Sequence, residues 1–179
     1  ECSPEANRGD WTRLHIRRAN TLLILGDLTS DSDILASALK GYEDADLARS
    51  LSHKETDSAE VQIGKAITLA ILGRADKDED KLLNAVSLIS RNLTHISRLS
   101  DNFRWAIVHH NLSTAFRTLF DLTGDPSYSD QALNALRSAL EVLTMEASPD
   151  QCMSAVSSLV RLLIDRGEYD EARSRLDEA

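Results

Sequence analysis

The sequence predicts an all-α fold in which about eight helices form antiparallel hairpins that stack as a helical solenoid. Three observations support this prediction: apolar residues recur at helical spacing, short turns interrupt them, and the pattern repeats along the chain. The composition agrees, because only 4% of the 179 residues are aromatic and both glycine and proline are scarce. A β-rich fold of short strands would need many glycine and proline turns.

The segment 109–140 shows the pattern most clearly. Apolar residues recur there at steps of three and four, which places them on one stripe of a helix. Gly124 suits the left-handed residue that ends a helix, and Pro126 suits the first turn of the next one. A second stripe follows, whose alanines let two antiparallel helices approach closely. The stripes are Val108, Leu112, Ala115, Phe116, Leu119 and Leu122, and then Ala132, Leu133, Leu136, Ala139, Leu140 and Leu143.

The same hairpin recurs along the chain. The sequence IGKAITLAILG at 63–73 matches IRRANTLLILG at 16–26 without a gap, at an offset of 47 residues. Four of the seven glycines, at spacings of 47, 51 and 43 residues, are expected to lie in the turns of the hairpins. Two helices per period indicate a helical solenoid. The expected turn glycines are Gly26, Gly73, Gly124 and Gly167.

The last unit, SSLVRLLIDRGEYDEARSRLDEA, carries large, small and glycine residues at Leu159, Val160, Leu163, Gly167, Tyr169, Ala172, Leu176 and Ala179. In this pattern it is similar to the tetratricopeptide repeat (TPR). The central unit, with Asn111-Leu112-Ser113, Ala115-Phe116 and Ala132, resembles the longer-loop variety of that repeat. The resemblance covers nearly the whole chain in about four units. It implies a right-handed superhelix whose first helices line a concave groove.

The chain length favours one domain with a sizeable core. We expect a polar lead-in over residues 1–10 and a single helical repeat domain over residues 11–179. The four expected units span about 11–53, 57–99, 101–147 and 149–179.

The first four helices each have a start signal and a stripe. Helix one is expected over about 11–25, and the capping residues 29–32 precede helix two. Gly41 inside helix two costs about 1 kcal/mol relative to Ala, which a close crossing by a neighbouring helix would explain. Asp57 and Glu60 have capping-box spacing before helix three. The expected core positions of helix one are Leu14, Ile16, Ala19, Leu22, Leu23 and Leu25.

The remaining helices have similar signals. The charged run 77–81 is expected to be the solvated first turn of helix four, and helix five starts near 100–102. Ser148, Pro149 and Gln151 form a strong start for helix seven, with a cap, a first-turn proline and a glutamine three residues after the cap. Helix eight has apolar positions at Ala172, Leu176 and Ala179.

The net charge of −9 argues against binding to nucleic acid or to an anionic membrane. No run of about eighteen apolar residues predicts a membrane span. Cys2 and Cys152 lack a metal-ligand spacing and indicate a reduced, cytoplasmic protein, although a disulfide stays possible. Asn92 and Asn111 match the glycosylation acceptor pattern, but both lie within helical periodicity, where chance explains the match better.

No catalytic, cofactor or metal motif is evident, so we expect neither an enzyme nor a bound cofactor. Adjacent His109 and His110 point about 100° apart on a helix and cannot readily share a metal ion. There is no glycine-rich phosphate loop and no nucleophile motif. The acidic clusters lie at expected helix starts, where they complement the helix dipole.

The first helices of the hairpins offer a candidate peptide-binding groove. Helical phase selects residues that lie off the apolar stripe of each helix, and the resemblance to the TPR family implies that these residues face inward. Asn111 matches an asparagine with which the family often holds the backbone of a bound peptide. The set contains four permanent cations and no carboxylate, in a chain of net charge −9. It comprises Trp11, His15, Arg18, Gln62, Lys65, His110, Asn111, Thr114, Arg117, Ser158 and Arg161.

Three functions are compatible with these features. The first is a protein–protein interaction scaffold whose groove holds a peptide or protein segment, in particular an acidic one. The second is a structural spacer or self-association module of a larger signalling protein, because the chain lacks a starting Met and ends on an apolar edge at Leu176 and Ala179. The third is a small-ligand sensor in which Trp11, His15 and His110 stack on a ring.

Overall fold

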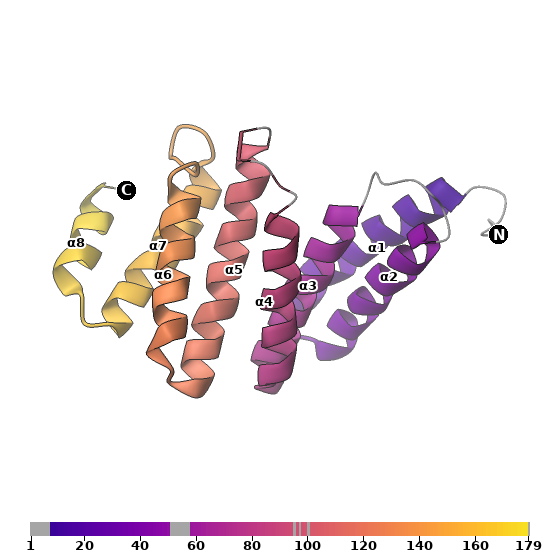
Figure 1. Ribbon diagram of the computed structural model, residues 1–179, viewed down its shortest axis with the longest axis horizontal. Coiled ribbons are helices and arrows are strands. Elements are labelled where there is room, and N and C mark those ends of the chain that lie inside the picture. Colours follow the sequence, from indigo (N-terminus) through magenta and orange to yellow (C-terminus); the bar gives the residue numbers. More distant parts are fainter. Residues whose placement is uncertain (1–7, 51–57, 95, 97, 100, 179) are drawn as a thin grey trace. The chain divides into compact units, whose positions relative to one another are not determined.

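The chain is described by a computed structural model, which covers residues 8–50, 58–94, 96, 98, 99 and 101–178 (Figure 1). The regular structure of these residues is entirely helical, which confirms the predicted all-α class. Their eight helices agree with the predicted number. They are α1 (Arg8–Thr29), α2 (Ser32–Ser50), α3 (Ser58–Asp76), α4 (Glu79–Leu93), α5 (Asn102–Thr123), α6 (Pro126–Leu140), α7 (Pro149–Asp165) and α8 (Tyr169–Glu178).

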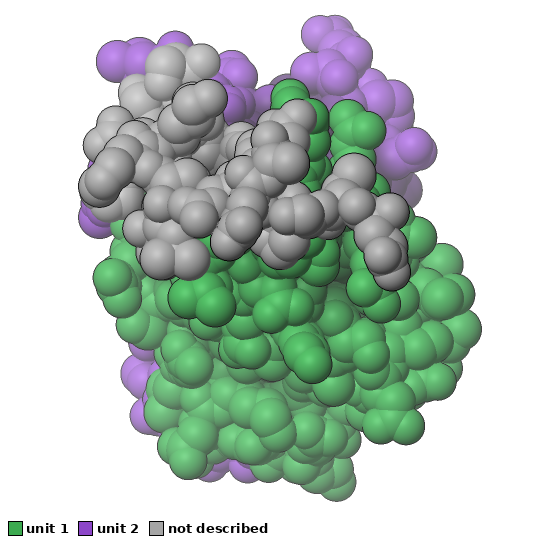
Figure 2. All heavy atoms as spheres, turned by 90° about the vertical axis from the view of Figure 1, so that its right-hand side faces the viewer, with its two compact units in different colours: residues 1–92 green, residues 93–179 purple. Residues whose placement is uncertain are grey.

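The helices pack as hairpins of sequence neighbours, and the chain forms two compact units, residues 1–92 and residues 93–179 (Figure 2). In unit 1, α1 packs on α2, α2 packs on α3, and α1 also contacts α3. In unit 2, α5, α6, α7 and α8 pack in the same sequential way, and α5 also contacts α7. The first helices of consecutive hairpins therefore touch within each unit. The right-handed superhelix stays a prediction.

The predicted role of the turn glycines is correct for only two of them. Gly124 and Gly167 have φ of 71° and 77° and lie in the turns after α5 and α7. Gly26 and Gly73 instead lie inside α1 and α3. The left-handed turn residues of unit 1 are Ser30 and Lys77, both at φ 54°.

Close packing explains why Gly26 and Gly73 are glycines. A Cβ at Gly26 would lie 2.7 Å from Cγ of Leu35, and a Cβ at Gly73 would lie 2.8 Å from Cγ of Leu82. Each leucine belongs to the second helix of the same hairpin. Glycine is therefore needed where the two helices cross, because any side chain would force them apart.

Two further glycines in unit 1 also lie at helix crossings. A Cβ at Gly41 would come within 3.1 Å of Cβ of Ala19 on α1, which confirms the close crossing expected there. A Cβ at Gly64 would lie 2.4 Å from the ring of Tyr42, so that ring rests directly on the backbone of α3. The first three helices are thus locked by small residues as much as by large ones.

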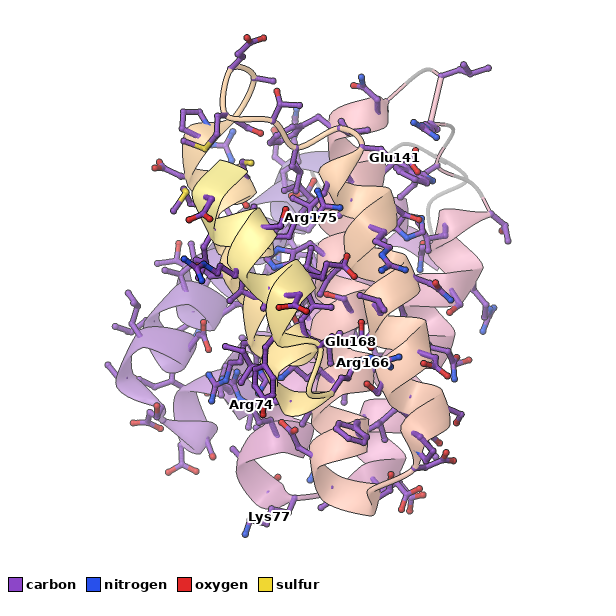
Figure 3. The ribbon with its side chains drawn as sticks, turned by 90° about the vertical axis from the view of Figure 1, so that its left-hand side faces the viewer. Arg74, Lys77, Glu141, Arg166, Glu168 and Arg175 are labelled. Atoms are coloured by element: carbon purple, nitrogen blue, oxygen red, sulfur yellow. The ribbon has the colours of Figure 1, made fainter. Side chains whose placement is uncertain are left out.

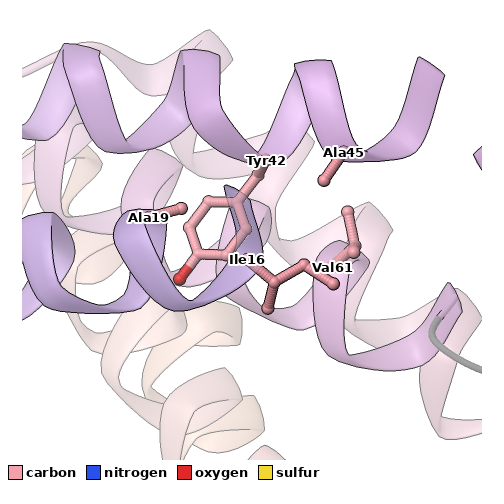
Figure 4. Close-up of a cluster of buried hydrophobic side chains, with 5 residues drawn as sticks. All are labelled: Ile16, Ala19, Tyr42, Ala45 and Val61. Carbon is pink, nitrogen blue, oxygen red and sulfur yellow. The ribbon is translucent and has the colours of Figure 1, made fainter. Parts of the chain in front are cut away.

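The core of unit 1 surrounds Tyr42 (Figure 4). Ile16 and Ala19 of α1, Ala45 of α2 and Val61 of α3 complete the cluster, and all five side chains are buried. A buried tyrosine adds a large apolar area and needs a partner for its hydroxyl group. One side chain from α2 therefore connects three helices.

The core of unit 2 is made mainly of leucines, alanines and valines from α5, α6 and α7. Phe116 of α5 and Tyr128 of α6 stack with ring centroids 6.3 Å apart. Cys152 of α7 is buried and has a free thiol, while Cys2 lies outside the described residues. The largest fully buried side chains of this unit are Val108, Leu119, Leu136, Leu143, Leu159, Leu162 and Leu163.

Aspartates cap four of the eight described helices, and two of these aspartates, Asp31 and Asp78, belong to the predicted acidic clusters. Asp31, Asp78, Asp101 and Asp125 accept hydrogen bonds from backbone N–H groups in the first turns of α2, α4, α5 and α6. These bonds satisfy donors that a helix leaves free at its start. α7 begins at Pro149 as predicted, but the Ser148 side chain makes no capping bond. The proposed starts at Asp57 and Ser100 lie outside the described residues.

Some expected core positions are exposed. α1 is longer than predicted, and Leu14 and Leu25 lie on its solvent side. Leu176 of α8 is also exposed, and Ala179 lies outside the described residues. Helical phase explains the exposure of Leu14, because Thr12, Ile16 and Ala19 face the core and Leu14 lies nearly opposite them on α1. Within the part of the chain that is described, no helix is both long and apolar enough to cross a bilayer.

The difference in burial predicts unequal effects of truncation in α5 and α1. Phe116 is 8% exposed, whereas Leu14 is 62% exposed. Phe116→Ala should therefore lower the free energy of unfolding by about 3–5 kcal/mol, the usual cost of removing a buried aromatic ring. Leu14→Ala should lower it by about 1 kcal/mol or less. Urea denaturation of both variants measures the difference, and a larger loss for Leu14→Ala would contradict this fold.

Candidate functional site

In unit 2, α5 and α7 together form a polar surface. Except for Asn111, which directly follows His110, the residues of each helix are spaced at three and four, so they lie along one side of that helix. Direct contacts between α5 and α7 bring the two sets side by side. We call this surface the α5/α7 face; it consists of His110, Asn111, Thr114, Arg117 and Asp121 of α5, and Ser154, Ser158, Arg161 and Asp165 of α7.

His110 and Ser158 connect the two helices at one end of the α5/α7 face. His110 Nε2 lies 3.3 Å from Ser158 Oγ. The Ser158 hydroxyl donates its proton to the carbonyl oxygen of Ser154 at 2.9 Å, so Oγ is free to accept one from His110. This geometry assigns the proton of neutral His110 to Nε2. Burial lowers the pKa of His110, which favours that neutral form.

Arg117 lies between two carboxylates at the other end. Its terminal nitrogen is 3.4 Å from Oδ2 of Asp165 on α7 and 3.6 Å from Oδ2 of Asp121 one turn away. Its Nε is buried and has no acceptor among the described residues. The expectation of a surface with cations and no carboxylates is therefore wrong here. Asp165 lies 48 residues after Arg117, and only the packing of α7 on α5 reveals it.

Three groups on the α5/α7 face retain binding capacity. Arg161 is exposed and forms no ion pair within the described part of the chain. Asn111 is half-buried, and its amide makes none of the described hydrogen bonds. Thr114 is exposed and bonds only to the carbonyl oxygen of His110 among the described groups. An incoming chain would therefore find a guanidinium donor, an amide donor and acceptor, and a hydroxyl acceptor.

In unit 1, the contacts between α1 and α3 are made by residues that were not predicted. Asn20 Nδ2 donates to Glu60 Oε1 at 3.2 Å, and Tyr42 donates its hydroxyl proton to Asn20 Oδ1 at 2.6 Å. Burial, with Glu60 adding to it, raises the pKa of Tyr42 to about 12. Arg74 and Asp27 form an ion pair at 3.3 Å. Asp27 and Arg74 are 47 residues apart, so the repeat offset is the signal that could have found them.

The predicted residues of unit 1 lie elsewhere on their helices. Trp11 and His15 stack on each other with centroids 3.7 Å apart. Lys65 points to α2, where its Nζ is 3.8 Å from Oε1 of Glu43. Gln62 is half-buried and Arg18 is exposed.

The left-handed turn residues fix the repeat register. Ser30, Lys77 and Gly124 follow one another at 47 residues, so Lys65 corresponds to Leu112 and not to Arg117. The predicted groove set therefore divides into two repeat positions. The α5 residues lie beside α7, whereas His15, Arg18, Gln62 and Lys65 lie on another side of their helices. Helical phase chosen separately for each helix could not reveal this division.

A second polar group in unit 2 surrounds Trp105. Its ring is 4.1 Å from the His109 ring, and Arg98 lies over it at 5.2 Å. Arg98 also pairs with Glu141 at 2.6 Å. Burial lowers the pKa of His109, opposed by the nearby charge of Glu141. The Trp105 ring, the His109 ring and the Arg98 guanidinium pack against one another, so this group contributes to packing and is not an open binding site.

Arg166 ties the end of α7 to the start of α6 (Figure 3). Its guanidinium donates to Glu168 at 2.6 Å, Asp130 at 2.7 Å and Ser129 at 3.0 Å. The hydrogen bonds and charges of Glu168 and Asp130 raise the pKa of Arg166. Because its Nε and Nη1 already bind acceptors of the same unit, we interpret Arg166 as a structural residue.

Neither metal binding nor glycosylation at Asn92 has a matching site among the described residues. Among the residues that the structure describes, no group of three histidine, cysteine, aspartate or glutamate residues could hold a metal ion. Asn92 is buried and donates to the carbonyl oxygen of Leu88 at 2.7 Å, so this glycosylation sequon is not presented to solvent. No protein-family model, curated protein or solved structure matches the chain.

The buried histidines predict an acid-dependent loss of stability. His109 and His110 have lowered pKa values in the folded protein, so the unfolded chain binds more protons below about pH 6.5. The free energy of unfolding should therefore decrease as the pH falls from about 7 to about 5. Urea denaturation across this range should show a shallower decrease for the His109→Gln/His110→Gln variant. An unchanged slope would contradict the assignment.

Tyr42 predicts a loss of stability at the opposite end of the pH scale. Its pKa of about 12 in the folded protein exceeds the ordinary value of 10.0, so its contribution is fully present below pH 10. As the pH rises from 10 to 12, the unfolded chain ionises first and the folded state loses stability. Tyr42→Phe should lose about 1 kcal/mol at neutral pH and show a smaller decrease above pH 10. Thermal denaturation of both proteins measures this, and equal decreases would exclude Tyr42 as the cause.

Proposed function

We propose that this chain is a non-enzymatic interaction scaffold that holds an acidic segment of another protein on the α5/α7 face. The observation that carries the proposal is the free hydrogen-bonding capacity of Asn111 and Arg161 on a surface built by two adjacent helices. The TPR-like character is part of the same proposal, supported by hairpins that cross at glycine and alanine. A cytoplasmic location is also proposed, supported by the free thiol of Cys152.

The amide of Asn111 supports recognition of a polypeptide backbone. A side-chain amide presents one acceptor and two donors, which match the N–H and C=O groups of an extended chain. Thr114 lies one turn further along α5 and adds a hydroxyl oxygen. Thr114 lies one turn after His110, on the side of α5 that contacts α7, and Asn111 lies next to that side, so a bound segment would run along α5 beside α7.

The guanidinium of Arg161 supports an acidic segment. The carboxylates of Asp121 and Asp165 already lie beside Arg117, which leaves the charge of Arg161 uncompensated. Guanidinium groups bind carboxylates through two parallel hydrogen bonds. Charge complementarity at this position would select an Asp or Glu of the partner.

The pair His110 and Ser158 supports binding more than catalysis. A serine nucleophile needs its hydroxyl hydrogen directed at the base. Here the hydrogen is directed at the carbonyl oxygen of Ser154, and His110 is the donor to Ser158. The pair therefore holds α5 and α7 together.

A peptide selection tests the proposed function. Random peptides displayed on phage are selected on the full chain, and the affinity of the enriched peptides is measured by fluorescence anisotropy. The enriched peptides should be rich in Asp and Glu. Arg161→Glu should weaken their binding about tenfold or more, because it replaces an attraction by a repulsion.

Arg173→Glu is the matched control. Arg173 is an exposed arginine of the same unit, lies on α8, and has no ion pair within the described residues. Its substitution changes the net charge equally and should leave the affinity unchanged. If both variants weaken peptide binding equally, the effect comes from overall charge and not from the position of Arg161. If Arg161→Glu leaves peptide affinity unchanged, the proposed site is wrong.

A further inference from the structure

The solvent side of α1 is unusually apolar. Leu14 and Ile24 are each 62% exposed and Leu28 is 80% exposed. A helix that is apolar on all sides is normally buried on all sides. α1 is apolar on its core side as well, through Ile16, Ala19 and Leu23. We call the exposed side the α1 outer face; it consists of Leu14, Arg17, Arg18, Thr21, Ile24, Leu25 and Leu28.

The internal repeat shows how buried the corresponding side of α3 is in the next hairpin. At the offset of 47 residues, Leu14, Thr21 and Leu25 of α1 correspond to Val61, Thr68 and Leu72 of α3. The α3 residues are 0%, 0% and 5% exposed. The same side of the helix is thus closed in α3 and open in α1.

A helix closes this side of α3. Val61 belongs to the Tyr42 cluster, and the Tyr42 ring rests on the backbone of Gly64. Lys65 pairs with Glu43 of the same covering helix, α2. The equivalents of Gly64 and Lys65 in α1 are Arg17 and Arg18. The internal repeat therefore specifies both the shape and one charge of a helix that would cover α1.

We propose that the α1 outer face docks an acidic amphipathic helix of another protein, in the way that α2 covers α3. This surface is separate from the α5/α7 face, so the proposal does not depend on the proposed function. The partner places small and aliphatic residues against Leu14, Leu25 and Leu28. It places carboxylates against Arg17 and Arg18.

Charge supports an acidic partner. Within the described residues, neither Arg17 nor Arg18 forms an ion pair, while Arg13 nearby is held by Asp10. Asp10, Arg13, Leu14 and Arg17 also line a shallow hollow of about 260 Å³, which offers room for a side chain. Two arginines without an ion pair on an apolar face attract carboxylates. The net charge of −9 disfavours binding of the chain to an anionic bilayer.

The test uses a synthetic peptide of residues 32–50 with Tyr42→Glu as the probe. This peptide keeps Glu43 opposite Arg18 and directs a second carboxylate at Arg17. A carboxylate at position 42 would be buried without a partner against Gly64, which disfavours replacement of α2 by the peptide. Fluorescence anisotropy should show binding to the full chain, with affinity reduced about tenfold or more by Arg17→Glu/Arg18→Glu. A peptide with Tyr42→Arg and Glu43→Arg should regain affinity for that variant.

Ile24→Asp tests the apolar part, with Leu176→Asp as the matched control. Ile24 and Leu176 are 62% and 60% exposed and lie in different units. Because both side chains are exposed, both variants should fold, and circular dichroism measures whether they do. Only Ile24→Asp should abolish binding of the peptide. Equal effects of the two variants, or no binding of the peptide to the unaltered chain, would overturn the proposal.

Two other occupants of the α1 outer face would give different results. Light scattering that shows dimers of the chain alone, lost in Ile24→Asp, would assign the face to a second copy. Sedimentation with vesicles of phosphatidylserine and phosphatidylcholine, lost in the same variant, would assign it to a membrane. Either result would overturn the proposal, whereas the α5/α7 face would be unaffected by Ile24→Asp.

Discussion

The close approach of paired helices is the constraint on which the rest of this structure depends. Gly26 and Gly73 let Leu35 and Leu82 reach the backbone of the facing helix, and Gly41 does the same for Ala19. Any larger residue at these positions would separate the axes and open the core. Once the hairpins of unit 1 are closed in this way, their first helices come into contact. The polar contacts between α1 and α3 depend on that spacing.

The helices and their pairing could be predicted because their signals are local. Apolar spacing, a capping aspartate and a first-turn proline each lie within a few residues of the feature they specify, as at Asp125 and Pro126. The turns of unit 1 could not be predicted in the same way. A glycine suits a left-handed turn and a close helix crossing equally well, and Gly26 and Gly73 serve the second purpose.

The candidate site shows where sequence patterns stop being informative. His110, Thr114 and Arg117 share one side of α5 by spacing alone, and the structure places that side against α7. The partner of Arg117 could not be predicted, since Asp165 is distant in sequence and its position depends on packing. The sequence predicts Leu14 in the core because α1 is apolar on two sides, and periodicity alone cannot decide which side is closed. The 47-residue register does not decide it either, since the exposed Leu14 of α1 corresponds to the buried Val61 of α3.

The packing of sequence neighbours also bears on how each unit folds. Within a unit, the farthest helices in contact are consecutive first helices, and their polar contacts join residues 40 to 48 apart. Closing such a loop costs little more entropy than closing a single hairpin, because the cost grows only with the logarithm of loop length. Low contact order of this kind is associated with fast folding. Each hairpin can therefore form as soon as its second helix leaves the ribosome, and the next hairpin can then add to a surface that already exists.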